Sequence, residues 1–406
     1  MTPELTYLDN ASTSWPKAPA VGPAMLGAIN SPAGNPGRGQ HRVSRRAGEA
    51  TCHLREAIAS RINAPSPDRI CLSSGSTASL NDAILGLLWC GAPPRGPRPR
   101  VVTTALEHNA VRRPLKHLER DGYCEVVEVG CSRDGFVDPA EVVGAAADER
   151  CCAVVMTMCS NVVGTAQPIE QIGRGLRERA AHVLFIADGA QAMGALPIDV
   201  QAMQIDVLAF SGHKAMLGPG GTGGMFVSDR AYREDGTSCR VRPTRYGGTG
   251  GTLAGSVEDF NPPELPGVFE VGTQNVVGRA GLLAALEDES VPSQPAALAH
   301  ERRLIGMFIE RFEGDRAVSI LGPRDVSRRH GVVTFNVAGF SAQEVSTYLD
   351  GEWGIAVRAG LHCAPSAHRA MGTLEGGGAV RASPGPFSTD EEMASLIRAI
   401  ESLITR

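Results

Sequence analysis

Short apolar runs alternate with helix-like segments through most of this 406-residue chain. Six runs have the length and apolar composition of buried strands, and they cover residues 70–72, 100–104, 153–158, 183–187, 206–210 and 224–227. Patterns with helical spacing lie between them, for example at 78–88 and 169–181. Strands that alternate with helices usually form a mainly parallel sheet covered by helices on its faces. The alternation therefore predicts an α/β large domain.

The pattern changes after about residue 285, where short strands are expected among helices at 332–335, 355–358 and 379–382. The last helix is expected to begin at Ser388, because Ser388 and Glu391 have capping-box spacing. Apolar residues then recur at helical intervals as far as Ile404. We therefore expect a large domain and a smaller α+β domain, with these bounds: 17–282 for the first, and 1–16 with 283–406 for the second.

Composition excludes several classes of function. The net charge is −5 and no long basic run occurs, which argues against binding to nucleic acid or to an anionic membrane surface. No apolar stretch reaches membrane-spanning length. The ten cysteines form no Cys-x-x-Cys pair and have no zinc-ligand spacing, so no metal site is expected. The first seven residues lack the features of a signal peptide, and a cytoplasmic protein is predicted.

Lys214 is one of only three lysines, against 36 arginines. It follows the apolar run at 206–210, after Ser211, Gly212 and His213. A desolvated lysine can lose its proton and become a nucleophile, whereas an arginine stays charged. The alternative is a solvated lysine at a strand end, and it fits poorly because 207–210 has the pattern of a strand buried on both faces. The sequence therefore predicts a Schiff-base lysine.

Polar residues also follow four other predicted strands, and ligands of α/β sheets bind beyond the carboxyl ends of the strands. We therefore expect one site that combines Lys214 with these residues: Ser76, Thr77, His108, Asn161, Asp188, Gln191, Ser211 and His213. Each type suits a part of pyridoxal phosphate. Lys214 can hold the aldehyde, and Asp188 can pair with the pyridine nitrogen. Gln191 and Asn161 can bind the ring hydroxyl, and His108 can stack on the ring.

Simpler interpretations remain open for single residues of this set. Asp188 could be a helix N-cap, and His108 could be a core histidine. The Gly75-Ser76-Thr77 segment opens a helix, which favours a phosphate but is also an ordinary cap. Ser211 and His213 can add phosphate donors. Neither a Gly-x-x-x-x-Gly-Lys motif nor a good Gly-x-Gly-x-x-Gly motif occurs, which argues against an ATPase or a dinucleotide-dependent dehydrogenase.

Eight segments in order resemble the class V aminotransferase family, and within it the cysteine desulfurases: 7–13, 73–77, 106–108, 160–165, 187–191, 211–214, 269–273 and 357–364. The segments at 34–41 and 247–250 are similar to a desulfurase-related subgroup. The resemblance implies a pyridoxal phosphate enzyme of fold-type I, like aspartate aminotransferase, with a mainly parallel seven-stranded sheet. It also implies a homodimer with active sites at the subunit interface.

The resemblance also implies roles for individual residues. Lys214 is the Schiff-base lysine, and Asp188 pairs with the pyridine nitrogen. Gln191 contacts the ring oxygen, and His108 stacks on the ring. Phosphate contacts are implied for these residues: Thr77, Ser211, His213 and, from the neighbouring subunit, Thr273. Arg381 matches the arginine that binds the substrate carboxylate, and guanidinium–carboxylate pairing suits that role. We add Asn161 and Arg358 as candidate substrate contacts.

Cys363 matches the catalytic cysteine of the group II desulfurases. Arg358 and His362 are near it in sequence and can lower the pKa of a thiol. The chain departs from the family at three positions: Leu361 replaces a histidine, Ala78 a glutamate and Gln274 a proline. The contributions of Arg38, His41 and His362, the sulfur acceptor and the pathway served are left open.

The expected reaction converts L-cysteine to L-alanine. Lys214 takes the Cα proton, and Cys363 attacks the substrate sulfur and becomes a persulfide that passes to an acceptor protein or thiol. Other reactions on the same scaffold remain open: a selenocysteine lyase, a lyase of cysteine conjugates, or a transaminase, against which Cys363 argues. A cofactor-binding scaffold or sulfur-relay partner with little turnover is an alternative of a different class.

Overall fold

The computed structural model describes residues 5–32, 34–36, 39, 41–89, 92–232, 240–248 and 264–405. Its main element is a seven-stranded sheet whose strands follow the order β2 (Ile70–Ser73), β8 (Gly223–Val227), β7 (Val207–Ser211), β6 (Leu184–Asp188), β5 (Cys151–Thr157), β3 (Arg100–Thr104) and β4 (Glu125–Val129). Only β8 is antiparallel to its neighbours. The predicted mainly parallel seven-stranded sheet is confirmed.

The six apolar runs correspond to six of these strands, and β4 is the one that the apolar pattern did not indicate. Its sequence is Glu-Val-Val-Glu-Val, and only Val129 is buried. β4 lies at the edge of the sheet and pairs only with β3. An edge strand is less buried than a central strand, so polar residues can interrupt its apolar run, as Glu125 and Glu128 do here.

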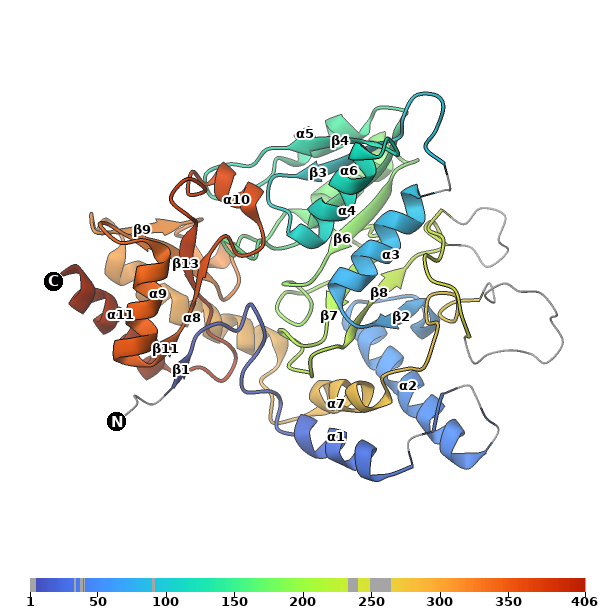
Figure 1. Cartoon of the computed structure of the whole chain (residues 1–406), viewed down its shortest axis with the longest axis horizontal. Helices are drawn as coiled ribbons and strands as arrows, with labels where there is room; N and C mark the ends of the chain where they lie inside the picture. The colour runs from blue at the N-terminus through green and yellow to red at the C-terminus, as the bar shows by residue number, and fades with distance from the viewer. Residues whose placement is uncertain are drawn as a thin grey trace.

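Helices cover both faces of the sheet (Figure 1). One core contains side chains of α2 (Arg42–Arg61), α5 (Pro139–Ala146), α6 (Ile169–Arg179) and α7 (Val276–Glu287). The opposite core contains side chains of α3 (Ser76–Leu88) and α4 (Asn109–Arg120). The helix α1 (Val21–Asn30) lies against α7. The central strands β6, β7 and β8 are buried along their whole length because helices cover them on both sides.

A second, smaller sheet has the order β12 (Arg358–Gly360), β13 (Ala379–Ala382), β10 (Val333–Val337) and β9 (Val318–Leu321), and all its pairs are antiparallel. Its helices are α8 (Gln294–Phe312), α9 (Ala342–Trp353), α10 (Pro365–Ala370) and α11 (Asp390–Ile404). Two short 3-10 helices precede β2 and β10, at Pro67–Arg69 and Val326–Arg328. The strand β1 (Thr6–Tyr7) pairs with β11 (Ile355–Ala356). This pairing joins Thr6 and Tyr7 to the small domain, and the domain bounds stay a prediction.

The start of α11 differs by one residue from the prediction. Thr389 is the N-cap and forms the capping box with Glu392, whereas Ser388 accepts a hydrogen bond from the backbone of Gly385. The segment contains two overlapping matches to the capping-box spacing, and the sequence pattern alone did not separate them. The helix itself lies where the apolar periodicity predicted it.

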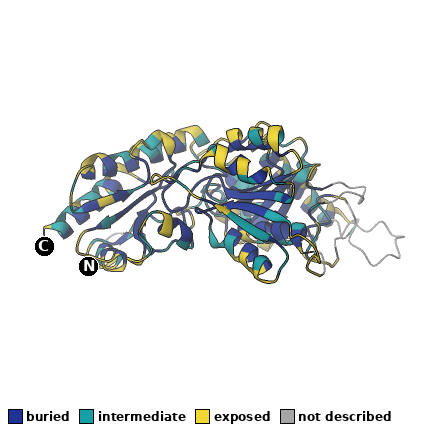
Figure 2. Cartoon of the chain, turned by 90° about the horizontal axis from the view of Figure 1, so that it is seen from above, coloured by how far each residue is buried: buried dark blue, intermediate teal, exposed yellow. Residues whose placement is uncertain are grey.

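The two sheets form the interiors of two lobes. Figure 2 shows buried strands inside each lobe and exposed residues on the outer faces of the helices. The first and last described elements, β1 and α11, both lie in the small lobe (Figure 1). Within the described residues, no helix combines the length and hydropathy needed to cross a bilayer. The carboxyl ends of the parallel strands carry the polar residues that the sequence singled out.

Candidate active site

A cavity of about 210 Å³ collects the predicted site residues from both domains. Nine of them line it from the large domain: Ser76, Thr77, His108, Asn161, Asp188, Gln191, Ser211, His213 and Lys214. Arg358 and Arg381 line it from the small domain, together with His362. The strand ends therefore meet at one edge of the sheet, opposite β12 and β13 of the small domain.

Lys214 follows β7 in a tight turn that fixes its backbone. The carbonyl of the preceding residue, His213, accepts hydrogen bonds from the backbone of Ser14 (3.0 Å) and from the amine of Lys17 (2.8 Å). Lys214 is half-buried and lines the cavity, and burial of the amine lowers its pKa to about 8. The nearby Asp188 carboxylate opposes that shift. A substantial fraction of the amine is therefore neutral, as a nucleophile requires.

Asp188 ends β6 and is 3% exposed. Its Oδ1 accepts hydrogen bonds from Ser76 Oγ (3.0 Å) and from the backbone of Ala190 (2.9 Å). The second bond is the local turn contact that the N-cap interpretation expected. Both of these hydrogen bonds are to Oδ1, and the residue lines the cavity. One carboxylate oxygen is therefore available to a cationic ring nitrogen.

The start of α3 forms the anion-binding side of the cavity. Gly75 precedes the helix with φ +142°, a conformation that favours glycine. The backbone N–H of Ser76 donates to Ser211 Oγ (3.1 Å), so these two predicted phosphate donors are bonded to each other. Thr77 is exposed and keeps its hydroxyl at the helix N-terminus. His213 is half-buried, and desolvation lowers its pKa to about 4, so it faces this region as a neutral ring.

His108 caps α4 and also faces the cavity. Its Nδ1 accepts a hydrogen bond from the backbone of Ala110 (3.0 Å), which assigns the ring proton to Nε2. Desolvation lowers the pKa of His108 and outweighs the opposite effect of Asp188. The ring is therefore neutral near pH 7. The ring of His108 also has a structural role, because it caps α4. That role agrees with part of the core-histidine interpretation.

The side-chain amides of Gln191 and Asn161 each hold a neighbouring loop. Gln191 Nε2 donates to the carbonyl of Ala11 (3.0 Å), and Asn161 Nδ2 donates to the carbonyl of His362 (2.7 Å). Both residues still line the cavity. One N–H of each side-chain amide donates to a backbone carbonyl, and the side-chain oxygen remains as an acceptor for a ligand.

Arg381 in β13 is 1% exposed and is surrounded by polar partners. Its Nη2 donates to Asp9 Oδ1 and to Ser12 Oγ, each at 2.8 Å, and its Nη1 donates to the carbonyl of Asn161 (3.0 Å). Its Nε has no partner within the described residues. The sequence indicated Arg381 but assigned no contact to Asp9 or Ser12, although both lie in the 7–13 segment that carried the resemblance.

Cys363 lies in the loop after β12 and does not itself line the cavity, although its neighbour His362 does. Arg358 Nη2 lies 3.2 Å from Cys363 Sγ, and Arg358 Nη1 donates to Ser12 Oγ (3.0 Å). The carbonyl of Cys363 accepts a hydrogen bond from the backbone of Asn109 (2.8 Å), next to His108. A thiol is thus paired with a guanidinium that lines the cavity of Lys214.

Comparison with known proteins now gives the family. The family model described as Aminotransferase class-V matches residues 6–396. The chain belongs to the class V aminotransferase family. A probable cysteine desulfurase from Methanothermobacter thermautotrophicus is 31% identical over 397 residues, which cover 98% of this chain and 94% of the relative. The cysteine desulfurase of Haloferax volcanii is 30% identical over 404 residues, which cover 99% and 90% of the two chains.

Solved structures of cysteine desulfurases have the same fold. The apo enzyme from Thermococcus onnurineus NA1 gives a TM-score of 0.88 at 27% identity and covers 99% of this chain and 95% of that chain. CsdA from Escherichia coli gives 0.84 at 26% identity and covers 98% and 94%. The family resemblance and the fold class predicted from the sequence are both confirmed.

Thr273, which the family resemblance assigned to the neighbouring subunit, does not line the Lys214 cavity. It is exposed and lines a separate cavity of about 190 Å³ that also contains Glu270 and Arg279. Its contact with the phosphate site of a second subunit stays a prediction. Arg38 lies outside the described residues. His41 caps α2, and its side chain accepts a hydrogen bond from the backbone of Ser44.

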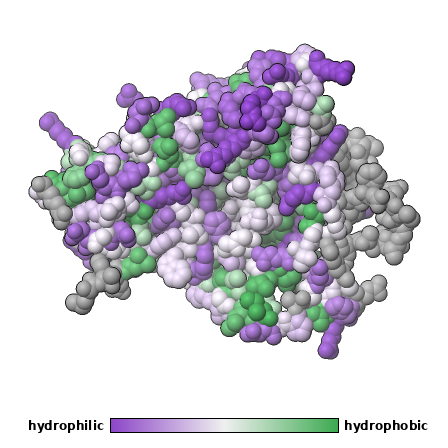
Figure 3. Space-filling view, viewed as in Figure 1, coloured by the Kyte–Doolittle hydropathy of each residue, from purple (hydrophilic) through white to green (hydrophobic). Residues whose placement is uncertain are grey.

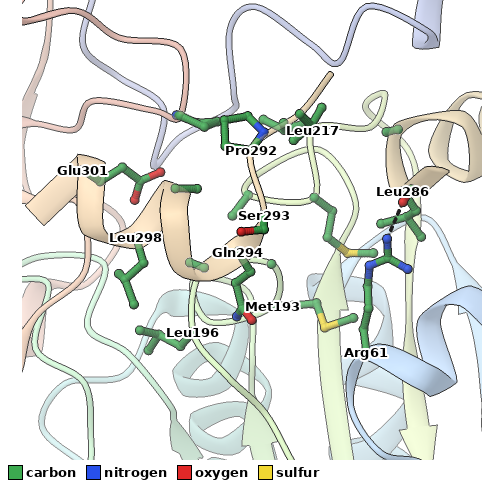
Figure 4. Close-up of a pocket in the computed structure, with 18 of the residues that line it drawn as sticks. Arg61, Met193, Leu196, Leu217, Leu286, Pro292, Ser293, Gln294, Leu298 and Glu301 are labelled. Atoms are coloured by element: carbon green, nitrogen blue, oxygen red, sulfur yellow. Dashed lines mark hydrogen bonds between the residues drawn. The ribbon is translucent and has the colours of Figure 1, made fainter. Parts of the chain in front are cut away.

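The largest of these cavities does not contain the chemistry expected of this family. It measures about 310 Å³ and lies where α7 and α8 approach the turn that contains Met193 and Leu196 (Figure 4). Its walls are mainly apolar, and the guanidinium of Arg61 is bonded to the carbonyl of Leu286. The smaller cavity combines an amine and a carboxylate with an arginine that contacts the Cys363 thiol, so it is the candidate active site.

Proposed function

We infer that this protein is a pyridoxal phosphate-dependent cysteine desulfurase, which converts L-cysteine to L-alanine and moves the sulfur to Cys363. The observation that carries this inference is the contact between Arg358 and Cys363 Sγ, because Arg358 lines the cavity of Lys214. A transaminase has no use for a thiol at that position. The relatives named as cysteine desulfurases match the whole chain and support the same conclusion.

The residues of the cavity fit pyridoxal phosphate. Lys214 offers an amine with a pKa of about 8, and Asp188 offers a buried carboxylate that lines the cavity. Thr77 at the start of α3 and the neutral His213 suit a phosphate group. When bound, the cofactor supplies an electron sink for negative charge at the substrate Cα. The neutral His108 ring is proposed to cover the ring face, and Gln191 and Asn161 to contact the ring oxygen.

Two arginines are proposed to bind the carboxylate of L-cysteine. Arg381 lines the cavity, and Asp9 and Ser12 hold its Nη2 in place, so its guanidinium is fixed for an anionic ligand. Arg358 is half-buried beside it and shares the contact with Ser12. Bidentate pairing of a guanidinium with a carboxylate fixes orientation as well as charge. The backbone carbonyl of Asn161 accepts a hydrogen bond from Arg381 Nη1 and so helps to hold the guanidinium in place.

Lys214 and Cys363 divide the chemistry between them. Lys214 is proposed to take the proton from the substrate Cα, which its lowered pKa permits near neutral pH. The thiolate of Cys363 then attacks the substrate sulfur. An S–S bond forms, the Cβ–S bond breaks, and its electron pair stays with the carbon skeleton, which takes up protons and leaves as L-alanine. The persulfide of Cys363 passes its outer sulfur to an acceptor thiol, on a protein or a small molecule.

A homodimer is proposed, with Thr273 of each subunit reaching the phosphate of the other. Figure 3 shows an apolar region over α1, where Leu26 and Ile29 are 59% and 64% exposed. Apolar surface of this kind is typical of a protein interface. Sedimentation equilibrium would test the dimer, and Leu26→Glu is expected to weaken it. The cytoplasm is the proposed compartment, and the eight cysteines within the described residues are all free thiols.

Incubation of the purified protein with L-cysteine tests the proposed function. With a thiol reductant, we expect steady formation of L-alanine and sulfide. Without it, we expect the Cys363 peptide to gain the mass of one sulfur atom. Alanine formation without sulfur on Cys363 would contradict the proposed sulfur route, and pyruvate in place of alanine would indicate a different lyase. The same assay with selenocysteine or a cysteine conjugate defines the preferred substrate.

A further inference from the structure

Two buried histidines lie behind the Cys363 loop, and the proposed chemistry does not use them. His362 is 2% exposed, and His368 in α10 is fully buried. His362 Nδ1 lies 3.0 Å from His368 Nε2, and the two ring centroids are 5.0 Å apart. His368 Nδ1 lies 2.8 Å from Thr373 Oγ1. Three side chains thus form a continuous hydrogen-bonded chain under the cysteine.

The partners at the two ends of this chain define its direction. His362 Nε2 lies 3.3 Å from the carbonyl of Arg358, which can only accept a hydrogen bond, so Nε2 carries the proton. His362 Nδ1 is then a bare acceptor, and His368 Nε2–H donates to it. His368 Nδ1 is in turn the acceptor for the hydroxyl of Thr373. Both rings are therefore neutral Nε2–H tautomers, and one assignment satisfies every atom.

Electrostatics supports two neutral rings. Desolvation lowers the pKa of His362 to about 2, and the charges of Arg381 and Arg358 act in the same direction. Desolvation also lowers the pKa of His368 to about 4. A proton added to His362 Nδ1 would face the Nε2–H donor of His368 in a buried site. The chain is thus a fixed structural element across the range of neutral pH.

The backbone that this chain supports is unusual. His362 and Cys363 both have positive φ, at +49° and +57°, and neither is glycine. Side-chain residues rarely adopt this left-handed conformation, and they keep it only where the surroundings hold it. Asn161 holds the carbonyl of His362 and Asn109 holds the carbonyl of Cys363, both from the large domain. The histidine chain is the support from the small domain.

We propose that His368, oriented by Thr373, is a positioning residue that holds the neutral His362 ring and thereby fixes the Cys363 loop for attack on the substrate sulfur. This proposal rests on the proposed function of Cys363. His368 does not line the cavity and is not expected to touch substrate or cofactor. Its effect should therefore appear in the sulfur step and not in proton transfer at Cα, which depends on Lys214.

The test measures these two steps separately in the cofactor-loaded enzyme. Exchange of the Cα proton of L-alanine in D₂O, followed by NMR, reports proton transfer. A single turnover with L-cysteine, followed by the mass of the Cys363 peptide, reports the persulfide. His368→Ala is expected to slow persulfide formation about 10- to 100-fold, the scale of a misplaced reacting group, with exchange unchanged. His368→Gln, whose amide can donate in place of Nε2–H, should restore most of the persulfide rate.

Two further variants keep the test decisive. Thr373→Val preserves volume but removes the donor to His368, and we expect a smaller loss in the same step. His300→Ala truncates a histidine that bonds to the carbonyl of Ser388 elsewhere in the small domain, and it should change neither step.

In the cofactor-free protein, iodoacetamide should alkylate Cys363 at a different rate in His368→Ala than in wild type, while exposed Cys52 reacts equally in both.

The outcomes separate this proposal from the proposed function. If wild type exchanges the alanine proton but forms no persulfide, the function assigned to Cys363 is wrong. If wild type forms the persulfide and His368→Ala forms it equally fast, the positioning role is overturned. Equal losses of exchange and persulfide in His368→Ala would also overturn it, because they would indicate general support of the fold. Failure of His368→Gln to restore the rate would argue against the hydrogen-bonded chain.

Discussion

The strand ends that carry Lys214 and Asp188 differ from the loop that carries Cys363 in how the backbone is held. β6 and β7 are central strands, buried along their length, with regular partners on both sides. The Cys363 loop has left-handed backbone at two residues and depends on single hydrogen bonds from Asn161, Asn109 and the His362 ring. One wall of the cavity is therefore part of a sheet, and the other is a supported loop.

This difference suggests a division of labour. The proton at Cα is proposed to move between groups fixed on the sheet, and sheet strands keep such groups in place with little help. The sulfur is proposed to move to a side chain on a loop, and it must later leave for an acceptor outside the cavity. Loops are the usual place for a group that must meet a second partner. The variants below test whether the two regions serve separate steps.

Lys214→Ala should give the largest effect and remove both steps. We expect alanine formation to fall on the order of 10⁶-fold, since the nucleophile and the base are the same amine. Exchange at Cα should stop as well. After borohydride reduction of the wild-type holoenzyme, the Lys214 peptide should carry the mass of the reduced cofactor. Lys116→Ala, an exposed lysine bonded to Glu119, is the matched control and should retain full activity. Cofactor mass on Lys17 or Lys116 would refute the assignment.

Cys363→Ala should remove the sulfur step and leave proton transfer at Cα intact. Alanine formation from L-cysteine is expected to fall on the order of 10⁴-fold, because the sulfur loses its nucleophile. Exchange at the Cα of L-alanine should continue at the wild-type rate, because Lys214 and Asp188 are intact. Cys52→Ala, which changes an exposed free cysteine, should affect neither step. A parallel loss of exchange in Cys363→Ala would mean that the loop and the strand ends do not act separately.

The sequence predicted the strand-end wall well because each of its residues follows a local pattern. An apolar run ends, and a polar residue comes next, as at Asp188 and Lys214. The partners of Arg381 could not be found this way, because Asp9 lies 372 residues away and no local spacing connects them. The resemblance pointed to Cys363, but not to its left-handed backbone. Nor did any pattern indicate His368, which meets His362 through the path of a six-residue helix.

Asp188→Asn tests the charge within the strand-end wall. The amide keeps the shape and the bond to Ser76 but removes the negative charge, so we expect turnover to fall about 100-fold. Asp188 raises the pKa of Lys214, so its removal should lower that pKa further below its present value of about 8. In the cofactor-free protein, the pH midpoint for acetylation of Lys214 should move down, while that of Lys116 stays fixed. An upward movement would contradict the assigned direction.

Glu107→Gln gives the smallest expected effect, and it tests stability rather than catalysis. Glu107 is fully buried beside His108, and its Oε1 accepts hydrogen bonds from Thr104 (2.6 Å) and from the backbone of Thr157 (3.1 Å). Its Oε2 has no partner within the described residues. Burial raises its pKa to about 8, and the charge of Asp188 adds to that shift. The folded protein therefore holds this proton over a pH range in which the unfolded chain releases it.

The sign of the pH effect follows from that difference. Because the folded pKa lies above the unfolded value of about 4.5, this group's contribution to stability is complete below pH 4.5 and is lost as pH rises toward 8, at about 1.4 kcal/mol per pH unit. A neutral Gln can make the same bonds without that loss. Unfolding temperatures of Glu107→Gln and wild type should thus be similar near pH 5, and the variant should gain as pH rises to 8. Glu178→Gln on the exposed surface of α6 is the matched control and should show no such trend. A pH-independent difference would mean that Glu107 is ionised in the folded protein, and the strand ends would then contain a second buried charge beside Asp188.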